Sequence, residues 1–402
     1  MPRLLTERPL LHTTSELACV MSAAREREAA GERVLHLERG EPDFDTPLPI
    51  CEALARAARE GHTHYPDARG DLLLREALVR KLANENRIIA HVDDLTVTAG
   101  GTHGLFLAMQ ALLTHGDELL VMSPHWMAIP KLVGFAEGAS HRSWPAYLSL
   151  QSGEWSTAEF RAALLAQIGP ATRGIYCNSP NNPTGVVLTR EQLGVIAQVA
   201  IERDLWVISD EAYEHLLHDG AEHVSLASLP GMAERTITAY TFSKSYAMTG
   251  WRVGYLVTPP AMRAVMGPLL AFYTTHGVFP ASQRAALAAV TGPQDEVRRM
   301  RDAYGERRGL LLDGLAGCAA ITVPIPRGAF YVFANISRAR GERDVWALVE
   351  SWLSIGVAAL PGTAFGPAFG DWVRLALCTR REDVIEAAAR LARHHATERA
   401  RS

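Results

Sequence analysis

Short apolar runs and helical stretches alternate along the middle of the chain. Between about residues 93 and 257, runs rich in Val, Ile, Leu and Thr end in glycine, proline or a polar side chain, and several are followed by a helical pattern of apolar positions. This alternation predicts strands joined by helices, and therefore a mostly parallel sheet flanked by helices. The predicted strands span 95–98, 118–122, 173–177, 205–209, 236–240 and 252–257, and the predicted helices span 50–60, 71–84, 101–113, 157–168 and 189–203.

The two ends of the chain follow a more mixed pattern. A helix over 15–30 ends at Gly31, and a short strand runs into a turn rich in glycine and proline. The C-terminal part predicts strands over 321–324, 329–333, 357–360 and 372–378 and helices over 294–315, 343–355 and 381–395. We expect an α/β fold with three parts: an N-terminal arm and part of a small domain (1–45), a large domain (46–292) and the C-terminal part of the small α+β domain (293–402).

Composition and charge narrow the class of protein. The 402 residues are 48% apolar and carry a formal charge of -4, which gives no electrostatic argument for nucleic-acid binding. The five cysteines are scattered and never spaced as CxxC, which argues against a disulfide framework or a metal site and favours a reducing compartment. The first residues lack the apolar core of a signal peptide, and no run approaches the roughly 20 apolar residues of a membrane span. We expect a soluble, cytoplasmic protein without a metal.

Lysine is rare, and one lysine lies between two β-rich runs. Only Lys81, Lys131 and Lys244 occur among 40 basic residues, the others being arginine. A lysine amine can lose its proton and act as a nucleophile, whereas a guanidinium stays protonated. Lys81 is predicted on an exposed helical face and Lys131 on another helix-like stretch. Lys244 is therefore the candidate for chemistry.

Other residues that could bind a ligand come directly after predicted strands, at Gly100–Thr102, Ser123–Trp126, Asn178–Asn182 and Asp210–Tyr213. Open parallel sheets bind ligands at the carboxyl ends of their strands, so these groups are expected to meet at one edge. Glycines between a strand and a helix present N–H groups to an anion. A carboxylate such as Asp210, at the end of an apolar strand, is costly to bury unless it meets a cation.

Three segments carry a family resemblance. They are Asn178-Ser-Pro-Asn-Asn-Pro-Thr-Gly185, Thr241-Phe-Ser-Lys-Ser-Tyr-Ala-Met-Thr-Gly-Trp-Arg252 and Gly40-Glu-Pro-Asp-Phe44. Over about residues 15–395 the chain resembles the class I and II aminotransferases, which are pyridoxal-phosphate enzymes of fold type I in the aspartate aminotransferase superfamily, and the motifs occur along the chain in the order of that family. Serine is common in that family where Thr241 stands here, and the hydroxyl is kept.

The resemblance implies a role for each matching residue. Lys244 would hold pyridoxal 5'-phosphate as a Schiff base and act as the general base. Asp210 would keep the ring nitrogen charged, and Tyr213 and Asn182 would contact the ring oxygen. Trp126 would stack on the ring. The phosphate contacts would come from Gly101, Thr102, Thr241, Ser243, Arg252 and, across a homodimer interface, Tyr65. The substrate carboxylate would lie against Arg374, Asn182 and the backbone of Gly40.

The expected reaction moves the amino group of an L-amino acid to a 2-oxo acid. An alternative is a lyase, decarboxylase, cyclase or oxidase reaction on the same scaffold, since the cofactor serves all of these. A more remote alternative is a regulator that has kept the fold, although no basic helix-turn-helix precedes Gly40.

The substrate side chain is open to aspartate-like, aromatic and small aliphatic donors. Candidate pocket walls lie near Ser15, Glu16, Phe272, Tyr273, His276 and Gly277. Glu16 could favour a polar or cationic substrate, but a solvated helix residue is the simpler interpretation.

Overall fold

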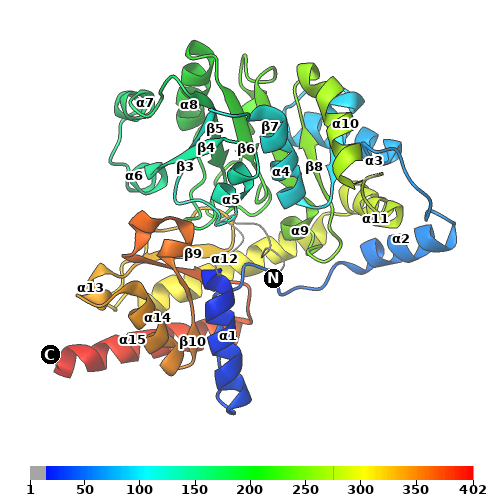
Figure 1. Cartoon of the computed structure of the whole chain (residues 1–402). Coiled ribbons are helices and arrows are strands. Elements are labelled where there is room, and N and C mark those ends of the chain that lie inside the picture. Colours follow the sequence, from blue (N-terminus) through cyan, green and yellow to red (C-terminus); the bar gives the residue numbers. More distant parts are fainter. Residues whose placement is uncertain (1–14, 275, 402) are drawn as a thin grey trace, which may run out of the picture.

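The alternating middle of the chain forms a seven-stranded sheet in the computed structural model, which describes residues 15–274 and 276–401 (Figure 1). The strand order is β2-β8-β7-β6-β5-β3-β4, and β8 alone runs antiparallel to its neighbours. The strands are β2 (Leu95–Thr98), β3 (Glu118–Met122), β4 (Ser140–Trp144), β5 (Thr172–Asn178), β6 (Trp206–Asp210), β7 (Thr236–Thr241) and β8 (Gly254–Val257). The predicted mostly parallel sheet is confirmed.

Helices cover both faces of this sheet. They are α2 (Leu48–Arg59), α3 (Leu72–Lys81), α4 (Gly101–Leu112), α5 (Ile129–Gly134), α6 (Ala146–Ser152), α7 (Thr157–Leu165), α8 (Arg190–Glu202), α9 (Phe242–Ser245), α10 (Arg263–Thr274) and α11 (Pro280–Thr291). Successive residues of β3 pack into two different hydrophobic cores, because side chains point to opposite faces of a strand in turn. Leu119 and Val121 pack with α4, α5 and α10, whereas Leu120 and Met122 pack with α6, α7 and α8.

The two ends of the chain share one core. The elements are α1 (Glu16–Ala29), β1 (Leu35–His36), α12 (Asp295–Leu315), β9 (Tyr331–Asn335), α13 (Ser337–Arg340), α14 (Val345–Ser354), β10 (Val357–Ala358), β11 (Leu360–Pro361), β12 (Trp372–Ala376) and α15 (Arg381–Arg401). β1 pairs in parallel with β10, and β11, β12 and β9 form an antiparallel sheet. Val20 and Leu35 pack with residues of α14 and β12, so α1 lies beside the C-terminal elements in Figure 1. The first 14 residues of the predicted arm lie outside the described residues.

Several predicted boundaries are wrong for identifiable reasons. Residues 321–324 form only an isolated bridge through Thr322, since Pro324 has no N–H to donate to a ladder. The strand predicted from Arg252 begins at Gly254, because Arg252 has a φ of 56°, outside the extended region. Residues 140–152 form β4 and α6, neither of which the sequence pattern predicted.

Lys81 is not on an exposed helical face, contrary to the prediction. It is 6% exposed and donates hydrogen bonds to Asn86 and to the carboxylate of Glu214. A lysine is buried only where a partner compensates its charge, and Glu214 is that partner.

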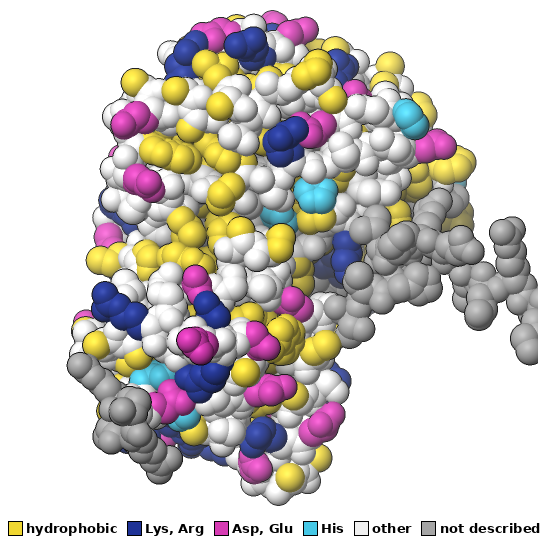
Figure 2. Space-filling view, turned by 60° about the vertical axis from the view of Figure 1, so that its left-hand side comes forward, with side chains coloured by type: hydrophobic (Ala, Val, Ile, Leu, Met, Phe, Trp, Pro, Cys, Tyr) yellow, Lys and Arg dark blue, Asp and Glu magenta, His cyan; other side chains and the backbone are white. Residues whose placement is uncertain are grey.

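Charged side chains of both signs are interspersed over the face that Figure 2 shows. Within the described residues, no helix is long and apolar enough to cross a membrane. All five cysteines lie within this part of the chain, and none forms a disulfide.

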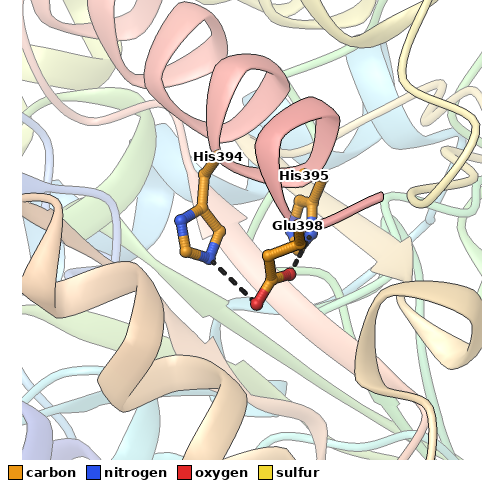
Figure 3. Close-up of side chains that lie close together, drawn as sticks. All are labelled: His394, His395 and Glu398. Atoms are coloured by element: carbon orange, nitrogen blue, oxygen red, sulfur yellow. Dashed lines mark hydrogen bonds and ion pairs between the residues drawn. The ribbon is translucent and has the colours of Figure 1, made fainter. Parts of the chain in front are cut away.

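Two histidines and a glutamate cluster near the end of α15 (Figure 3). The indole N–H of Trp352 donates to Nε2 of His395 at 2.9 Å, so the proton of this ring is on Nδ1, which lies 3.1 Å from Glu398. His394 bonds Ser351 at 2.9 Å. The bonds to Trp352 and Ser351 therefore attach α15 to α14, and the other ring nitrogen of His395 is bonded within α15 to Glu398, so the cluster has a structural explanation.

Candidate active site

A cavity of about 310 Å³ opens at the carboxyl edge of the large sheet, where the parallel strands end. Its lining comes from the loops after β2, β3, β5, β6 and β7, together with Gly40, Tyr331 and Arg374 from the part of the molecule formed by the chain ends. The lining residues are Leu17, Gly40, Glu41, Gly101, Thr102, Leu105, Trp126, Met127, Asn178, Asn182, Asp210, Ala212, Tyr213, Thr241, Ser243, Lys244, Thr249, Arg252, Tyr331 and Arg374. Every predicted site residue except Tyr65 is among them.

Lys244 follows β7 in the short helix α9 and reaches into the cavity. Its Nζ donates a hydrogen bond to the carbonyl oxygen of Gly40 at 2.8 Å. Burial lowers the pKa of Lys244 to about 8, and the charges of Arg374 and Arg252 act in the same direction. A substantial fraction of this amine is therefore unprotonated and nucleophilic near neutral pH.

The lowered pKa of Lys244 gives a testable result in the free protein. The rate at which a small acylating reagent modifies Lys244 is expected to rise with pH around a midpoint near 8, since only the neutral amine reacts. An ordinary lysine has a pKa of about 10.4. Peptide mapping by mass spectrometry after short labelling pulses would measure this rate, with the half-buried Lys131 as the internal reference. A midpoint for Lys244 at or above the ordinary lysine value would contradict the assignment.

Asp210 ends β6 and is 7% exposed. Its carboxylate accepts hydrogen bonds from the hydroxyl of Tyr176 at 2.8 Å and the backbone N–H of Ala212 at 3.2 Å. Burial raises the pKa of Asp210 to about 6, against the lowering effect of these two bonds. Among the described residues no cationic side chain forms an ion pair with Asp210, so a cationic ligand atom in the cavity would complete it.

The loop after β5 is fixed by its own side chains. Asn178 donates to the carbonyl oxygen of Asp210 at 2.8 Å and accepts from the backbone N–H of Asn182 at 2.8 Å. Asn181 accepts from the hydroxyl of Thr184 at 2.7 Å. The amide of Asn182 is consequently held in the cavity, where its oxygen accepts from Arg374 at 3.2 Å.

Arg374 lies on β12 and is 3% exposed. It donates to the carbonyl oxygen of Glu38 at 2.6 Å, and its guanidinium lies 4.4 Å from the ring centre of Tyr331. Its Nε is buried and has no hydrogen-bond partner among the described residues. A planar guanidinium with an unused donor is suited to a carboxylate.

A glycine cradle lines the cavity between β2 and α4. Gly100 has a φ of 82°, and a Cβ there would lie 2.6 Å from the guanidinium of Arg252. A Cβ on Gly254 would lie 2.8 Å from the backbone of Gly100 and Gly101. Glycine is therefore required for Arg252 to approach the first N–H groups of α4, which no side chain caps. The cradle has the donors for a phosphate, with the hydroxyls of Thr241 and Ser243 3.0 Å apart beside it.

Tyr65 lies outside this cavity. Tyr65 is 79% exposed, and the centre of its ring lies 4.3 Å from the centre of the His276 ring. The predicted pocket walls also lie elsewhere: Phe272 is 82% and Tyr273 44% exposed, and neither they nor Ser15 and Glu16 line the cavity.

Sequence reasoning missed Tyr331 and Tyr176. The hydroxyl of Tyr331 lies 3.0 Å from that of Tyr213, and Tyr176 donates to Asp210. Both occupy apolar strands, where a tyrosine is indistinguishable from core packing until its hydroxyl partner is known.

Comparisons with known proteins agree with this geometry. A family model described as aminotransferase class I and II matches residues 32–391. The chain is 35% identical to the aspartate aminotransferase of Geobacillus stearothermophilus over 95% of its length and 96% of the relative. It is 39% identical to an arginine–pyruvate transaminase of Pseudomonas aeruginosa over 91% of each chain. A solved single mutant of the Thermus thermophilus aspartate aminotransferase superposes with a TM-score of 0.88 at 37% identity, covering 98% of this chain and all of that one.

Proposed function

The chain belongs to the class I and II aminotransferase family and is an aminotransferase that acts on amino acids and oxo acids, and from this premise we propose that it works with pyridoxal 5'-phosphate bound covalently to Lys244. The observation that carries the proposal is a buried amine with a pKa of about 8 in the same cavity as Asp210, a buried carboxylate without a cation. The uncapped N-terminus of α4 beside Arg252 supports a phosphate at the other end.

Each end of the cavity would hold one part of the cofactor. Arg252, Gly101, Thr102, Thr241 and Ser243 would bind the phosphate. Asp210 would pair with the ring nitrogen, Trp126 would stack on the ring, and Tyr213 and Asn182 would donate to its oxygen.

The bound cofactor supplies an aldehyde that condenses with amines and a ring that draws electrons from the adjacent carbon. Arg374 would bind the carboxylate of the amino acid with its free Nε, and Asn182 and the backbone of Gly40 would fix its position. Lys244 Nζ, once displaced by the incoming amino group, would take the proton from Cα of the amino acid and return it to C4′ of the cofactor. Asp210 would keep the ring nitrogen positively charged throughout, so that the ring can accept the electron pair left when the Cα–H bond breaks.

Borohydride reduction tests the proposal. Protein incubated with pyridoxal phosphate should turn yellow, and reduction followed by digestion should leave the label on the peptide that contains Lys244. A colourless protein, or a label on Lys81 or Lys131, would overturn it. A panel of amino acids that includes aspartate and arginine, scored by oxo-acid release, would then define the donor.

We also propose that two copies associate. Tyr65 is exposed and far from its own cavity, which supports the expectation that it reaches the cofactor phosphate of a second copy. Tyr65→Phe removes one hydroxyl and is expected to weaken cofactor retention by about 1 kcal/mol, or fivefold, without changing the oligomeric state. Equilibrium dialysis and sedimentation equilibrium would measure the two quantities. A monomeric wild-type protein would contradict this arrangement.

A division into residues 1–45, 46–292 and 293–402, with both ends in one small domain, is likewise a proposal. The pairing of β1 with β10 and the core that Val20 and Leu35 share with the C-terminal part support it. Limited proteolysis tests it, because first cuts inside 46–292 rather than near its ends would contradict the boundaries.

A further inference from the structure

The turn after β6 presents its side chains in two directions. Asp210 and Tyr213 line the cavity, whereas Glu211 and Glu214, the residues that follow each of them, do not. Glu211 is 1% exposed and Glu214 is nearly as well buried, with a side chain 10% exposed. Two acidic groups are thus buried directly behind two residues of the active site, and neither takes part in the proposed reaction.

Glu211 is bonded to both strands that carry the site. It accepts from Ser209 at 3.0 Å, the residue before Asp210, and from Tyr240 at 2.8 Å, the residue before Thr241. Ser225 donates to it at 2.6 Å. This carboxylate therefore connects the ends of β6 and β7 just behind the cavity.

Glu214 is bonded to a different part of the molecule. Both of its oxygens accept from Nζ of Lys81 at 2.5 Å, and one accepts from Asn86 at 2.7 Å. Burial alone would raise the pKa of Glu214, but the ammonium of Lys81, the neighbouring His215 and His223 and the bond from Asn86 together lower it to about 2. Lys81 ends α3, and Asn86 closes the π-helix η2 (Leu82–Asn86), which continues from α3.

Asn86 and Tyr240 join the two carboxylates into one network. Asn86 donates to Ser225 at 2.9 Å as well as to Glu214, and Ser225 in turn donates to Glu211. The Nζ of Lys81 also lies 4.8 Å from the ring centre of Tyr240. Oxygens of the two carboxylates lie within 4.8 Å of each other and of a ring nitrogen of His223, whose Nε2 lies 2.8 Å from Glu211.

We propose that Lys81, Glu211 and Glu214 are positioning residues that hold Asp210 and Tyr213 against the cofactor ring, an inference that rests on the function proposed above. Without the ammonium of Lys81, Glu214 would lose its ion-pair partner. The imidazole of His223, which lies 2.8 Å from Glu211, would be left as the basic group beside the two carboxylates. Breaking a buried ion pair by removing one partner is strongly unfavourable. The turn would relieve the repulsion between the two carboxylates by opening, which would displace Asp210 and Tyr213, because each directly precedes one of the two carboxylates in the chain.

Three variants and one control test the inference in the full-length protein. Lys81→Met removes the charge and keeps the chain length, Glu214→Gln removes the opposite charge, and the double variant removes both. Lys131→Met, on α5 away from the cavity, is the matched control. Equilibrium dialysis with pyridoxal phosphate gives the dissociation constant, and the visible circular dichroism of the bound cofactor reports how its ring is held.

Each single variant is expected to weaken cofactor binding about tenfold, which corresponds to about 1.4 kcal/mol, and to diminish the visible dichroic band. The double variant should recover most of the affinity, because the two changes are coupled through one ion pair. Lys131→Met should match the wild type.

Single variants that fold but keep the wild-type dissociation constant and dichroic band would overturn the inference, since the network would then serve only the fold. If Lys81→Met does not fold, the isosteric variant Glu214→Gln tests the inference by the same two measurements, the dissociation constant and the visible dichroic band. A wild-type protein that binds no cofactor would instead overturn the proposed function itself.

Discussion

Lys244→Ala is expected to abolish transamination, lowering kcat by about a millionfold, the scale seen when a nucleophile that also takes part in proton transfer is removed. Among the described residues Lys244 is the one amine that lines the cavity, and its Nζ would serve both as the attachment point of the cofactor and as the base at Cα. Neither role can pass to Arg252 or Arg374, because a guanidinium stays protonated. Oxo-acid release under saturating donor, with pyridoxal phosphate added, measures the loss.

The control for this variant is Lys131→Ala. Lys131 lies on α5 and does not line the cavity, so its replacement should leave kcat within about twofold of the wild type, as expected for a substitution away from the reacting groups. Far-UV circular dichroism would establish that Lys244→Ala is folded. A folded Lys244→Ala variant that retains more than about a thousandth of the wild-type kcat would contradict the assignment, since the cavity alone would then support the reaction.

The part of the fold that could be predicted is the part set by local pattern. The buried strands of the large sheet, such as Trp206–Asp210, are apolar runs bounded by turn residues, and their mostly parallel arrangement followed from the alternation with helices. β4 could not be predicted, because it is an edge strand with four exposed positions and reads as a polar segment. The helix α6 has buried apolar residues, but its seven residues are too short a stretch for a helical period to be recognised.

The cavity was predictable because its residues come directly after strands. Asp210 and Lys244 each follow an apolar strand, and parallel strands place their ends together. Tyr331 is different: it reaches the cavity from the C-terminal part of the molecule, and only the packing of the chain ends against the large sheet brings its hydroxyl within 3.0 Å of Tyr213. A contact between residues 118 positions apart has no local signature.

Lys81 shows most clearly what the sequence pattern does not contain. On a helix, a lysine among arginine and glutamate is typical of an exposed face. Lys81 is buried because Glu214, 133 positions away, offers a carboxylate at the end of α3. Burial of a charge is decided by its partner, and the partner is known only once the fold is known.

Asp210→Asn is expected to lower kcat by about a thousandfold, which corresponds to about 4 kcal/mol in the barrier and lies in the range for a broken buried charge pair. Asparagine has the same shape and can keep the bond from Tyr176, but it carries no charge to hold the ring nitrogen positive. The KM for the amino acid should change much less, because the proposed ligand of the substrate carboxylate is Arg374 and not Asp210. Steady-state kinetics separate the two quantities.

Two further variants distinguish charge from hydrogen bonding at this position. Tyr176→Phe removes the 2.8 Å bond to Asp210 and leaves the charge, so it should cost only about 1 kcal/mol, or fivefold in kcat. Asp210→Glu keeps the charge on a longer side chain and should recover part of the activity lost in Asp210→Asn. If Asp210→Asn loses no more than Tyr176→Phe, the negative charge is not what the reaction needs, and the pairing of Asp210 with the ring nitrogen is wrong. If Asp210→Asn alone shows the large loss, the rise in its pKa to about 6 marks a carboxylate whose burial is compensated only when the cation is bound.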